Sequence, residues 1–373
     1  MEKLKRILHE ETVLVISATA AILSSCFVRP SENYLSYINF RVLVLLFCLM
    51  LVVAGFQKIG VLGVLAQRMT AGMKNTKALC TSLILLCFFS SMLITNDVAL
   101  ITFVPFSILV LTVTAQTNRM IFVIVMQTVA ANLGSMLTPV GNPQNLYLFS
   151  FYHIHATDFF KITLPITIAG LVLLALFSLL GKSENIEVQF HSKSVIRSKK
   201  QLLLYAILFA LCIVTVFYLV DYRVTLLTVC ITVFWADKHL FRKADYGLLA
   251  TFVCFFIFVG NIGNIQSVRT ALASLIAGHE LFFSVLLSQI ISNVPCAVLL
   301  STFTSHGKAL VLGTNIGGLG TLIASLASLI SFKFYVKTKD AKPLKYLGIF
   351  TGINVLILVL LLAFSACVFP TVK

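Results

Sequence analysis

Long apolar runs separated by short polar segments make up most of this chain of 373 residues. A helix needs about 20 mainly apolar residues to cross a bilayer, and runs close to that length recur from end to end. The pattern predicts an all-α polytopic membrane protein with about 9–11 transmembrane segments. The segments expected to cross the membrane without interruption are 12–28, 40–56, 158–180, 201–220, 222–236, 246–262 and 344–368.

Two further apolar runs are interrupted by polar residues at matching places in the two halves of the chain. Residues 78–115 are interrupted at Thr95-Asn96-Asp97, and residues 280–304 at Ser292 to Pro295. Lipid cannot satisfy the backbone groups of such an interruption, which must be buried in protein or line a wet cavity. We therefore expect a re-entrant hairpin in each half, with its tip at the polar residues.

Each predicted hairpin is followed by an apolar helix that we expect to be broken. Residues 119–143 should unwind near Asn132 to Gly134, because Pro139, Gly141 and Pro143 prevent a clean continuation. Residues 309–332 form the second broken helix.

The two interrupted regions share a register of polar and small residues. The aligned pairs are Ser91 with Ser288, Thr95 with Ser292, Asn96 with Asn293, Asn132 with Asn315, Gly134 with Gly317, and Thr138 with Thr321. Paired interruptions of this kind are the best sequence indication of a transporter's binding site. We expect one repeat in residues 1–180 and another in 201–373, joined by the hydrophilic linker 181–200.

Composition supports this interpretation and gives the chain an orientation. Only 11% of its residues are charged, against about 25% in soluble domains, and 59% are hydrophobic. The net charge of +15 does not indicate nucleic-acid binding, because the basic residues lie in short loops between apolar runs. The positive-inside rule instead places the N-terminus and the basic segments 57–77, 181–200, 237–245 and 333–345 in the cytoplasm. Hairpin one then enters from the cytoplasm and hairpin two from outside, which makes the repeats inverted.

The candidate binding residues lie at the predicted tips and breaks. Amides and hydroxyls there can offer oxygen to a cation or N–H groups to an anion, so we expect a substrate and ion site, with sodium at Asn96 and Asn293. The alternative is that these groups are polar contacts between helices. The candidates are Thr95, Asn96, Asp97, Asn132, Gly134, Thr138, Asn142, Ser292, Asn293, Thr314, Asn315, Gly317 and Thr321.

Asp97 is the one acid of the thirteen that we place at membrane depth, since the others lie in loops or at span ends. A carboxylate deep in a bilayer costs roughly 2.5–3.5 kcal/mol on insertion scales and is a functional candidate by default. The alternative is that Asp97 caps the second arm of hairpin one. Both roles can hold at once.

Other chemistry finds little support in the sequence. The nine cysteines form no C-x-x-C pair and mostly lie inside apolar runs, so we expect neither disulfides nor a metal site. No phosphate-binding loop is present, which argues against an ATP-driven mechanism. We expect no catalytic site and no cofactor besides a coupling ion, Na⁺ or H⁺.

The interrupted segments resemble the ion transporter superfamily, which includes arsenite permeases, sodium/proton antiporters of the D type, citrate transporters and divalent anion:sodium symporters. The resemblance lies in Thr95-Asn96-Asp97-Val98-Ala99-Leu100, in residues 131–145 with Thr138-Pro139-Val140-Gly141-Asn142-Pro143, in Ser292-Asn293-Val294-Pro295, and in residues 313–325. It implies inverted repeats, a homodimer and elevator-like motion. The dicarboxylate symporters carry Ser-Asn-Thr at both tips, whereas this chain has Thr-Asn-Asp and Ser-Asn-Val.

Three functional hypotheses follow. The first is a secondary active permease for a small inorganic or organic anion or oxyanion, multi-pass in the plasma membrane and driven by sodium or protons. The second is a cation/proton antiporter that uses Asp97. The third, an intramembrane enzyme, lacks a second acid or a set of metal ligands beside Asp97.

Overall fold

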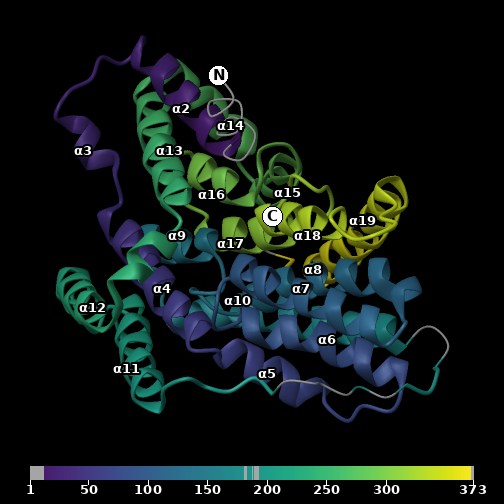
Figure 1. The fold of residues 1–373 in the computed structure, drawn as a ribbon. Helices are drawn as coiled ribbons and strands as arrows, with labels where there is room; N and C mark the ends of the chain where they lie inside the picture. The colour runs from purple at the N-terminus through teal and green to yellow at the C-terminus, as the bar shows by residue number, and fades with distance from the viewer. Residues whose placement is uncertain (1–11, 180–182, 187, 189–192, 371–373) are drawn as a thin grey trace, which may run out of the picture.

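The computed structural model describes residues 12–179, 183–186, 188 and 193–370, in which every regular element is a helix (Figure 1). The α-helices of the N-terminal half are α2 (Thr12–Ser25), α3 (Asn33–Tyr37), α4 (Phe40–Lys58), α5 (Val61–Thr70), α6 (Thr76–Ser91), α7 (Asn96–Val113), α8 (Met120–Ser135), α9 (Pro143–Phe151) and α10 (Ala156–Leu179). Those of the C-terminal half are α11 (Lys199–Val216), α12 (Tyr222–Asp237), α13 (Tyr246–Asn264), α14 (Gln266–Ile276), α15 (Glu280–Ile291), α16 (Asn293–Ser301), α17 (Gly307–Ile316), α18 (Leu326–Tyr335) and α19 (Pro343–Val368). Two 3₁₀ helices, η1 (Thr117–Arg119) and η2 (Lys238–Lys243), complete the set.

Side-chain caps fix where several helices begin. Asn39, Asn75, Asn142, Ser198 and Asp245 each accept a hydrogen bond from a backbone N–H in the first turn of the helix that follows. Such caps satisfy N–H groups that have no partner inside the helix. The caps therefore mark where a new helix begins, even where apolar residues continue from one helix into the next.

Seven helices in the described part of the chain are long and apolar enough to cross a membrane, and the pair α14 and α15, bent by 110°, can supply an eighth. One of the seven is α7, the second arm of hairpin one, whereas its first arm α6 and the halves of the broken helices are shorter and do not qualify as full spans. The predicted fold class, an all-α polytopic membrane protein, is confirmed.

Two hydrophobic cores organise the bundle. The first core contains α6, α7 and α8 of hairpin one and its following helix, together with α18 and α19. The second contains α4, α9, α11, α12, α13 and α16. In Figure 1 the blue helices of hairpin one lie together on one side, while the teal α11 and α12 lie against α4 on the other.

Each broken helix passes from one core to the other. Apolar residues of α8 belong to the first core and those of α9 to the second, so the first change of core falls at the break. In the other repeat the change falls inside α17: Leu310 and Val311 belong to the second core, while Leu312 and Ile316 of the same helix and Ala327 of α18 belong to the first. The two broken helices therefore run in opposite senses between the cores.

The structure corrects two expected boundaries. The first broken helix does not unwind at Asn132 to Gly134, because α8 continues through Ser135 and the break covers 136–142. Gly134 stays helical and is needed for close packing, since a Cβ there would overlap the backbone carbonyl of Phe88 in α6. At the second tip only Ser292 is non-helical, and Asn293 to Pro295 form the first turn of α16.

Candidate functional site

The tip of hairpin one is a short turn held from several sides. Thr95 precedes α7 without a side-chain cap, and the backbone N–H of Asn96 donates to the carbonyl of Gly141 in the first break at 3.1 Å. The Asn96 side chain donates to Asn132 Oδ1 at 2.9 Å and accepts from the Asp97 N–H at 3.0 Å. Asn96 is only 4% exposed, so its side-chain amide is buried and makes these hydrogen bonds inside the protein.

The tip of hairpin two is tighter and strained. Ser292 alone separates α15 from α16, with φ +73° and ψ +153°, a region that non-glycine residues rarely adopt. The backbone N–H of Asn293 donates to the carbonyl of Ala324 in the second break at 3.0 Å. Asn293 is also 4% exposed, yet within the described residues its side-chain amide has no hydrogen-bond partner.

The hairpins contact their broken helices through equivalent bonds. Thr138 Oγ1 donates to the Met92 carbonyl at 2.5 Å, and Thr321 Oγ1 donates to the Gln289 carbonyl at 3.0 Å. These residues are equivalent in the register read from the sequence, as are Gly141 and Ala324, whose carbonyls accept the N–H hydrogen bonds that hold the two tips. The same few contacts thus fix each hairpin against the break that follows it.

Glycine allows the close approach in both repeats. A Cβ on Gly134 would lie 2.5 Å from Ser91 Oγ, and one on Gly317 would lie 2.8 Å from Ser288 Oγ. Real Cβ atoms essentially never show contacts this short, so a side chain at either position would push the hairpin away from its broken helix. The Ser–Gly pairs of the predicted register are contacts in both halves.

Reciprocal hydrogen bonds join the two repeats to each other. Asn142, the N-cap of α9, donates to Asn315 Oδ1 at 3.2 Å, and Ser325, at the start of α18, donates to Asn132 Oδ1 at 3.2 Å. In each repeat, the residue just before the second half of the broken helix (Asn142 or Ser325) thus donates to an asparagine in the first half of the other repeat's broken helix (Asn315 or Asn132). Asn132 Nδ2 also donates to the Gly318 carbonyl at 3.3 Å.

Sequence reasoning missed several residues of this network. Asn145 accepts a hydrogen bond from Asn315 Nδ2 at 2.7 Å, and Gln289 Nε2 donates to the Gly317 and Leu319 carbonyls at 2.8 and 3.0 Å. Asn145 stands in the resembling segment, and Gln289 is a polar residue in an apolar hairpin arm, so both carried a signal. The predicted residue Thr314 is not part of the network, because its hydroxyl donates to Leu310 within α17.

A small cavity of about 10 Å³ lies where the tips and breaks meet, with room for about one water molecule. The first turns of four helices line it. They contribute Asn96 and Asp97 from α7, Pro143 and Gln144 from α9, Asn293 and Val294 from α16, and Ser325 and Leu326 at the start of α18, with Leu248 as the ninth lining residue. Backbone N–H groups and the positive ends of helix dipoles concentrate at helix starts and favour negative charge, part of which the Asp97 carboxylate itself supplies.

A larger cavity of about 320 Å³ adjoins the small one. Asp97, Pro143 and Leu248 line both cavities and form the partition between them. The larger cavity is mainly apolar, and its charged lining residues are Asp97, Lys243 and Asp245. A small molecule that entered it would have to pass this partition to reach the tips.

Asp97 lies in the first turn of α7 and faces both cavities, and Thr95 rather than Asp97 occupies the N-cap position. Within the described residues the Asp97 carboxylate accepts no hydrogen bond and has no cation within 4.0 Å. A cap of the second arm by Asp97 is therefore not observed. The carboxylate remains available to an ion or a proton.

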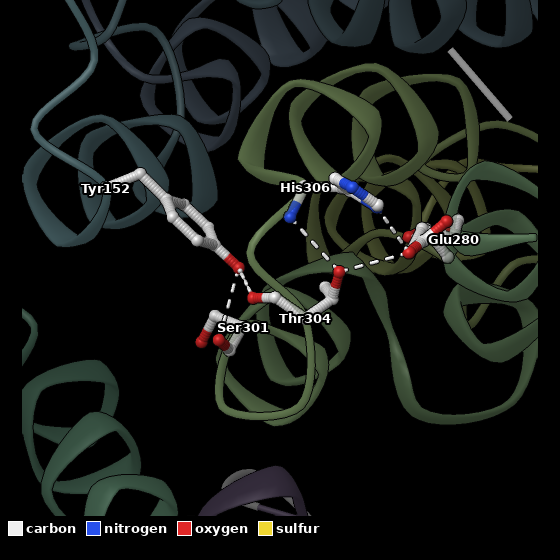
Figure 2. Close-up of polar contacts among 6 residues, drawn as sticks. Tyr152, Glu280, Ser301, Thr304 and His306 are labelled. Atoms are coloured by element: carbon white, nitrogen blue, oxygen red, sulfur yellow. Dashed lines mark hydrogen bonds and ion pairs between the residues drawn. The ribbon is translucent and has the colours of Figure 1, made fainter. Parts of the chain in front are cut away.

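The base of hairpin two is also tied to the first repeat (Figure 2). Glu280, buried at the start of α15, lies 2.6 Å from His306 Nδ1 and accepts a hydrogen bond from Thr304 Oγ1 at 3.1 Å. The Tyr152 hydroxyl donates to the Ser301 and Thr304 carbonyls at 3.1 and 2.8 Å, and burial raises the pKa of this phenol, which keeps it a donor. The end of α9 therefore fixes the loop that follows α16.

Three or more His, Cys, Asp or Glu residues do not gather anywhere in the described segments in a way that could hold a metal ion. Five of the nine cysteines are buried, and those in the described ranges are free thiols. Any cation at the tips would have to be held by amide, hydroxyl and backbone oxygens with Asp97.

A sequence model described as "Citrate transporter" matches residues 2–306, most of the chain. The chain belongs to the citrate transporter family. It is 34% identical over 267 residues to an uncharacterized transporter of Methanocaldococcus jannaschii, covering 70% of this chain and 72% of that protein. It is 28% identical to the inner membrane protein YbiR of Escherichia coli, covering 81% of this chain and 82% of that one. The predicted resemblance to the ion transporter superfamily is confirmed, and the chain is a membrane transporter by family.

Proposed function

We propose that this member of the citrate transporter family is a secondary active permease for a small inorganic or organic anion. The observation that carries the proposal is the convergence of four helix starts on one cavity between the two hairpin tips. Among the described residues no Lys or Arg lines that cavity, so the helix starts and the free amide of Asn293 would supply the attraction for the anion once a coupling ion or proton has neutralised Asp97. The binding roles of the other predicted site residues are part of the same proposal.

The two cavities suggest how the substrate reaches the site. A cavity of 320 Å³ has room for a small carboxylate or oxyanion, whereas 10 Å³ has not. The substrate would enter beside Lys243, and the hairpin tips would separate from the partition formed by Asp97, Pro143 and Leu248 to admit it. Elevator-like movement of the hairpins and broken helices is consistent with the close Ser–Gly contacts, which join them into one body.

Sodium or protons would drive the transport. A sodium ion at Asn96 would compete with the hydrogen bond that Asn96 Oδ1 accepts from the Asp97 N–H, so we favour Asn293 and Asp97 as the coupling groups. We further propose that the chain is a homodimer in the plasma membrane with a cytoplasmic N-terminus. The similar protein YbiR of Escherichia coli is named an inner membrane protein, which agrees with that location.

The test is uptake by purified chain in proteoliposomes, with a panel of labelled citrate, smaller carboxylates and arsenite, under imposed sodium or pH gradients. We expect accumulation of at least one anion above its equilibrium level under one gradient. Absence of anion uptake under either gradient would contradict the proposal.

A second candidate, a cation/proton antiporter, rests on Asp97 being the one carboxylate that lines the tip cavity. In the same proteoliposomes, sodium efflux that follows a pH jump without any anion would favour this candidate.

A further inference from the structure

A third cavity, of about 570 Å³, lies away from the hairpin tips, between α5 and the described part of the linker that leads into α11. Arg68, Lys193 and Lys199 line it together with apolar residues that include Val64 and Val195. It shares no lining residue with the two cavities at the tips. The transport site therefore does not account for it.

The wall of this cavity is fixed by hydrogen bonds. The Ser194 backbone N–H donates to Gln67 Oε1 at 2.6 Å, and the Arg197 N–H donates to the Ile59 carbonyl at 3.0 Å. The linker is thus held along α5 and at the end of α4. A cavity between two segments joined in this way is part of the fold.

The charges that the described residues place around the cavity are all positive. Among those residues no acid lines it, and none of Arg68, Lys193 and Lys199 has a carboxylate within 4.0 Å. Three neighbouring cations favour an anionic ligand, and a phosphate ester suits Arg and Lys together. Val195 is 67% exposed beside them, so the same site offers apolar contact.

The position in the fold identifies the source of such a ligand. α5 joins the end of the span α4 to the start of hairpin one, and Lys199 opens the span α11. Helix ends of this kind lie at the level of lipid headgroups. Basic sites at that level bind anionic lipid headgroups.

We propose that this cavity binds the headgroup of an anionic phospholipid, with the phosphate near Arg68, Lys193 and Lys199 and the acyl chains beside Val195. The lipid would hold the linker against α5. The proposal requires only that the chain is membrane-embedded, so it stands or falls independently of the transported substrate.

The test measures binding of phosphatidylglycerol to the full chain, delipidated in neutral detergent, by native mass spectrometry. The test variant is Arg68→Gln/Lys193→Gln/Lys199→Gln. Each surface cation contributes about 1 kcal/mol of attraction, or about fivefold in affinity, so we expect the apparent Kd to rise about tenfold or more. Phosphatidylcholine should bind both proteins weakly and equally.

The control variant, Lys337→Gln/Lys339→Gln/Lys345→Gln, removes the same charge from exposed positions in another basic segment. Its Kd should change less than about twofold. An equal loss in both triple variants would overturn the proposal in favour of diffuse surface attraction. Binding of soluble glycerol phosphate as tight as that of the lipid would overturn it in favour of a small-anion site. If the triple variant does not fold, Lys193→Gln in the exposed linker should still weaken binding about threefold to fivefold, and an unchanged Kd would overturn the proposal.

Discussion

The two hairpin tips have the same connections but different chemistry. Each holds its asparagine N–H against the carbonyl of the following break, and each receives a threonine hydroxyl from that break. At the first tip the asparagine side chain is bound internally and an acid follows it. At the second tip the amide is free, valine follows, and the backbone is strained. The shared bonds preserve the architecture, and the unshared groups fit the division between coupling and substrate binding that we propose.

The largest effect should come from Asp97, the acid of the first tip, whose equivalent at the second tip is Val294. Asp97→Asn should lower ion-driven accumulation at least about 100-fold, since an amide cannot take up or release a proton and holds a cation weakly. Downhill exchange of substrate should survive. The measurement is gradient-driven uptake in proteoliposomes, with Asp245→Asn as control, because Asp245 lines only the larger cavity and asparagine preserves its N-cap. Wild-type accumulation and pH dependence in Asp97→Asn would end the coupling hypothesis.

Substitution of the glycines in the two Ser–Gly contacts should reduce the stability of the protein in both cases. Gly134→Ala should reduce the free energy of unfolding by about 3 kcal/mol, since its Cβ would overlap a backbone carbonyl that cannot move alone. Gly317→Ala should cost about 2 kcal/mol, because its nearest contacts, the Gly313 carbonyl and Ser288 Oγ at 2.8 Å, are less close than the 2.0 Å contact at Gly134. Denaturation in detergent measures both. Gly348→Ala in α19 is the control, since no atom lies within 4 Å of its Cβ. Equal stability of all three variants would contradict close packing at the breaks.

The asparagines should separate structure from binding. Asn96→Ala should cost about 1–3 kcal/mol of stability, because it removes the buried hydrogen bond to Asn132 Oδ1 and takes from the Asp97 N–H its side-chain acceptor. Asn293→Ala should cost little stability and weaken anion binding about tenfold, which corresponds to about 1.4 kcal/mol. Thermal unfolding in detergent and ligand-induced shifts of the melting temperature measure the two effects. The reverse ranking would mean that the first tip binds the substrate.

The smallest effect concerns the backbone. Ser292→Gly should raise the free energy of unfolding by about 1 kcal/mol, because glycine adopts φ +73° without strain. Thr95→Gly should lower it by about 1 kcal/mol, since Thr95 has an ordinary φ of −61° and glycine only adds unfolded-state freedom. Chemical denaturation of the matched pair is the measurement. A loss of stability in Ser292→Gly would show that the tip is not strained.

The sequence predicted where polar residues interrupt the apolar helices and which of them contact each other in register, because asparagine, glycine and threonine are conspicuous inside apolar runs. It misplaced the first break, because Gly134 permits close packing as well as unwinding and the two roles look alike in sequence. The sequence left open whether the tips are buried in protein or line a wet cavity, and the structure buries Asn96 and Asn293. Burial there depends on helices far away in the chain.

The bonds between the repeats could not be predicted. Asn142 and Asn315 are separated by 173 residues, and no spacing rule relates them. The positive φ of Ser292 could not be predicted either, because serine does not favour it and only the surrounding contacts maintain it. The family resemblance supplied the expectation of a paired site but not its partners.

The reciprocal bonds of Asn142 and Ser325 also have a consequence for biosynthesis. Ribosomes deliver the N-terminal repeat first, and at that moment Asn132 and Asn142 have no second repeat to contact. Their side-chain amides lack these hydrogen-bond partners until Ser325 and Asn315 have been synthesised and inserted. Assembly of the nascent chain at these breaks is therefore a late event, and a messenger truncated before the second repeat would yield a membrane protein with exposed polar groups for quality-control proteases to recognise.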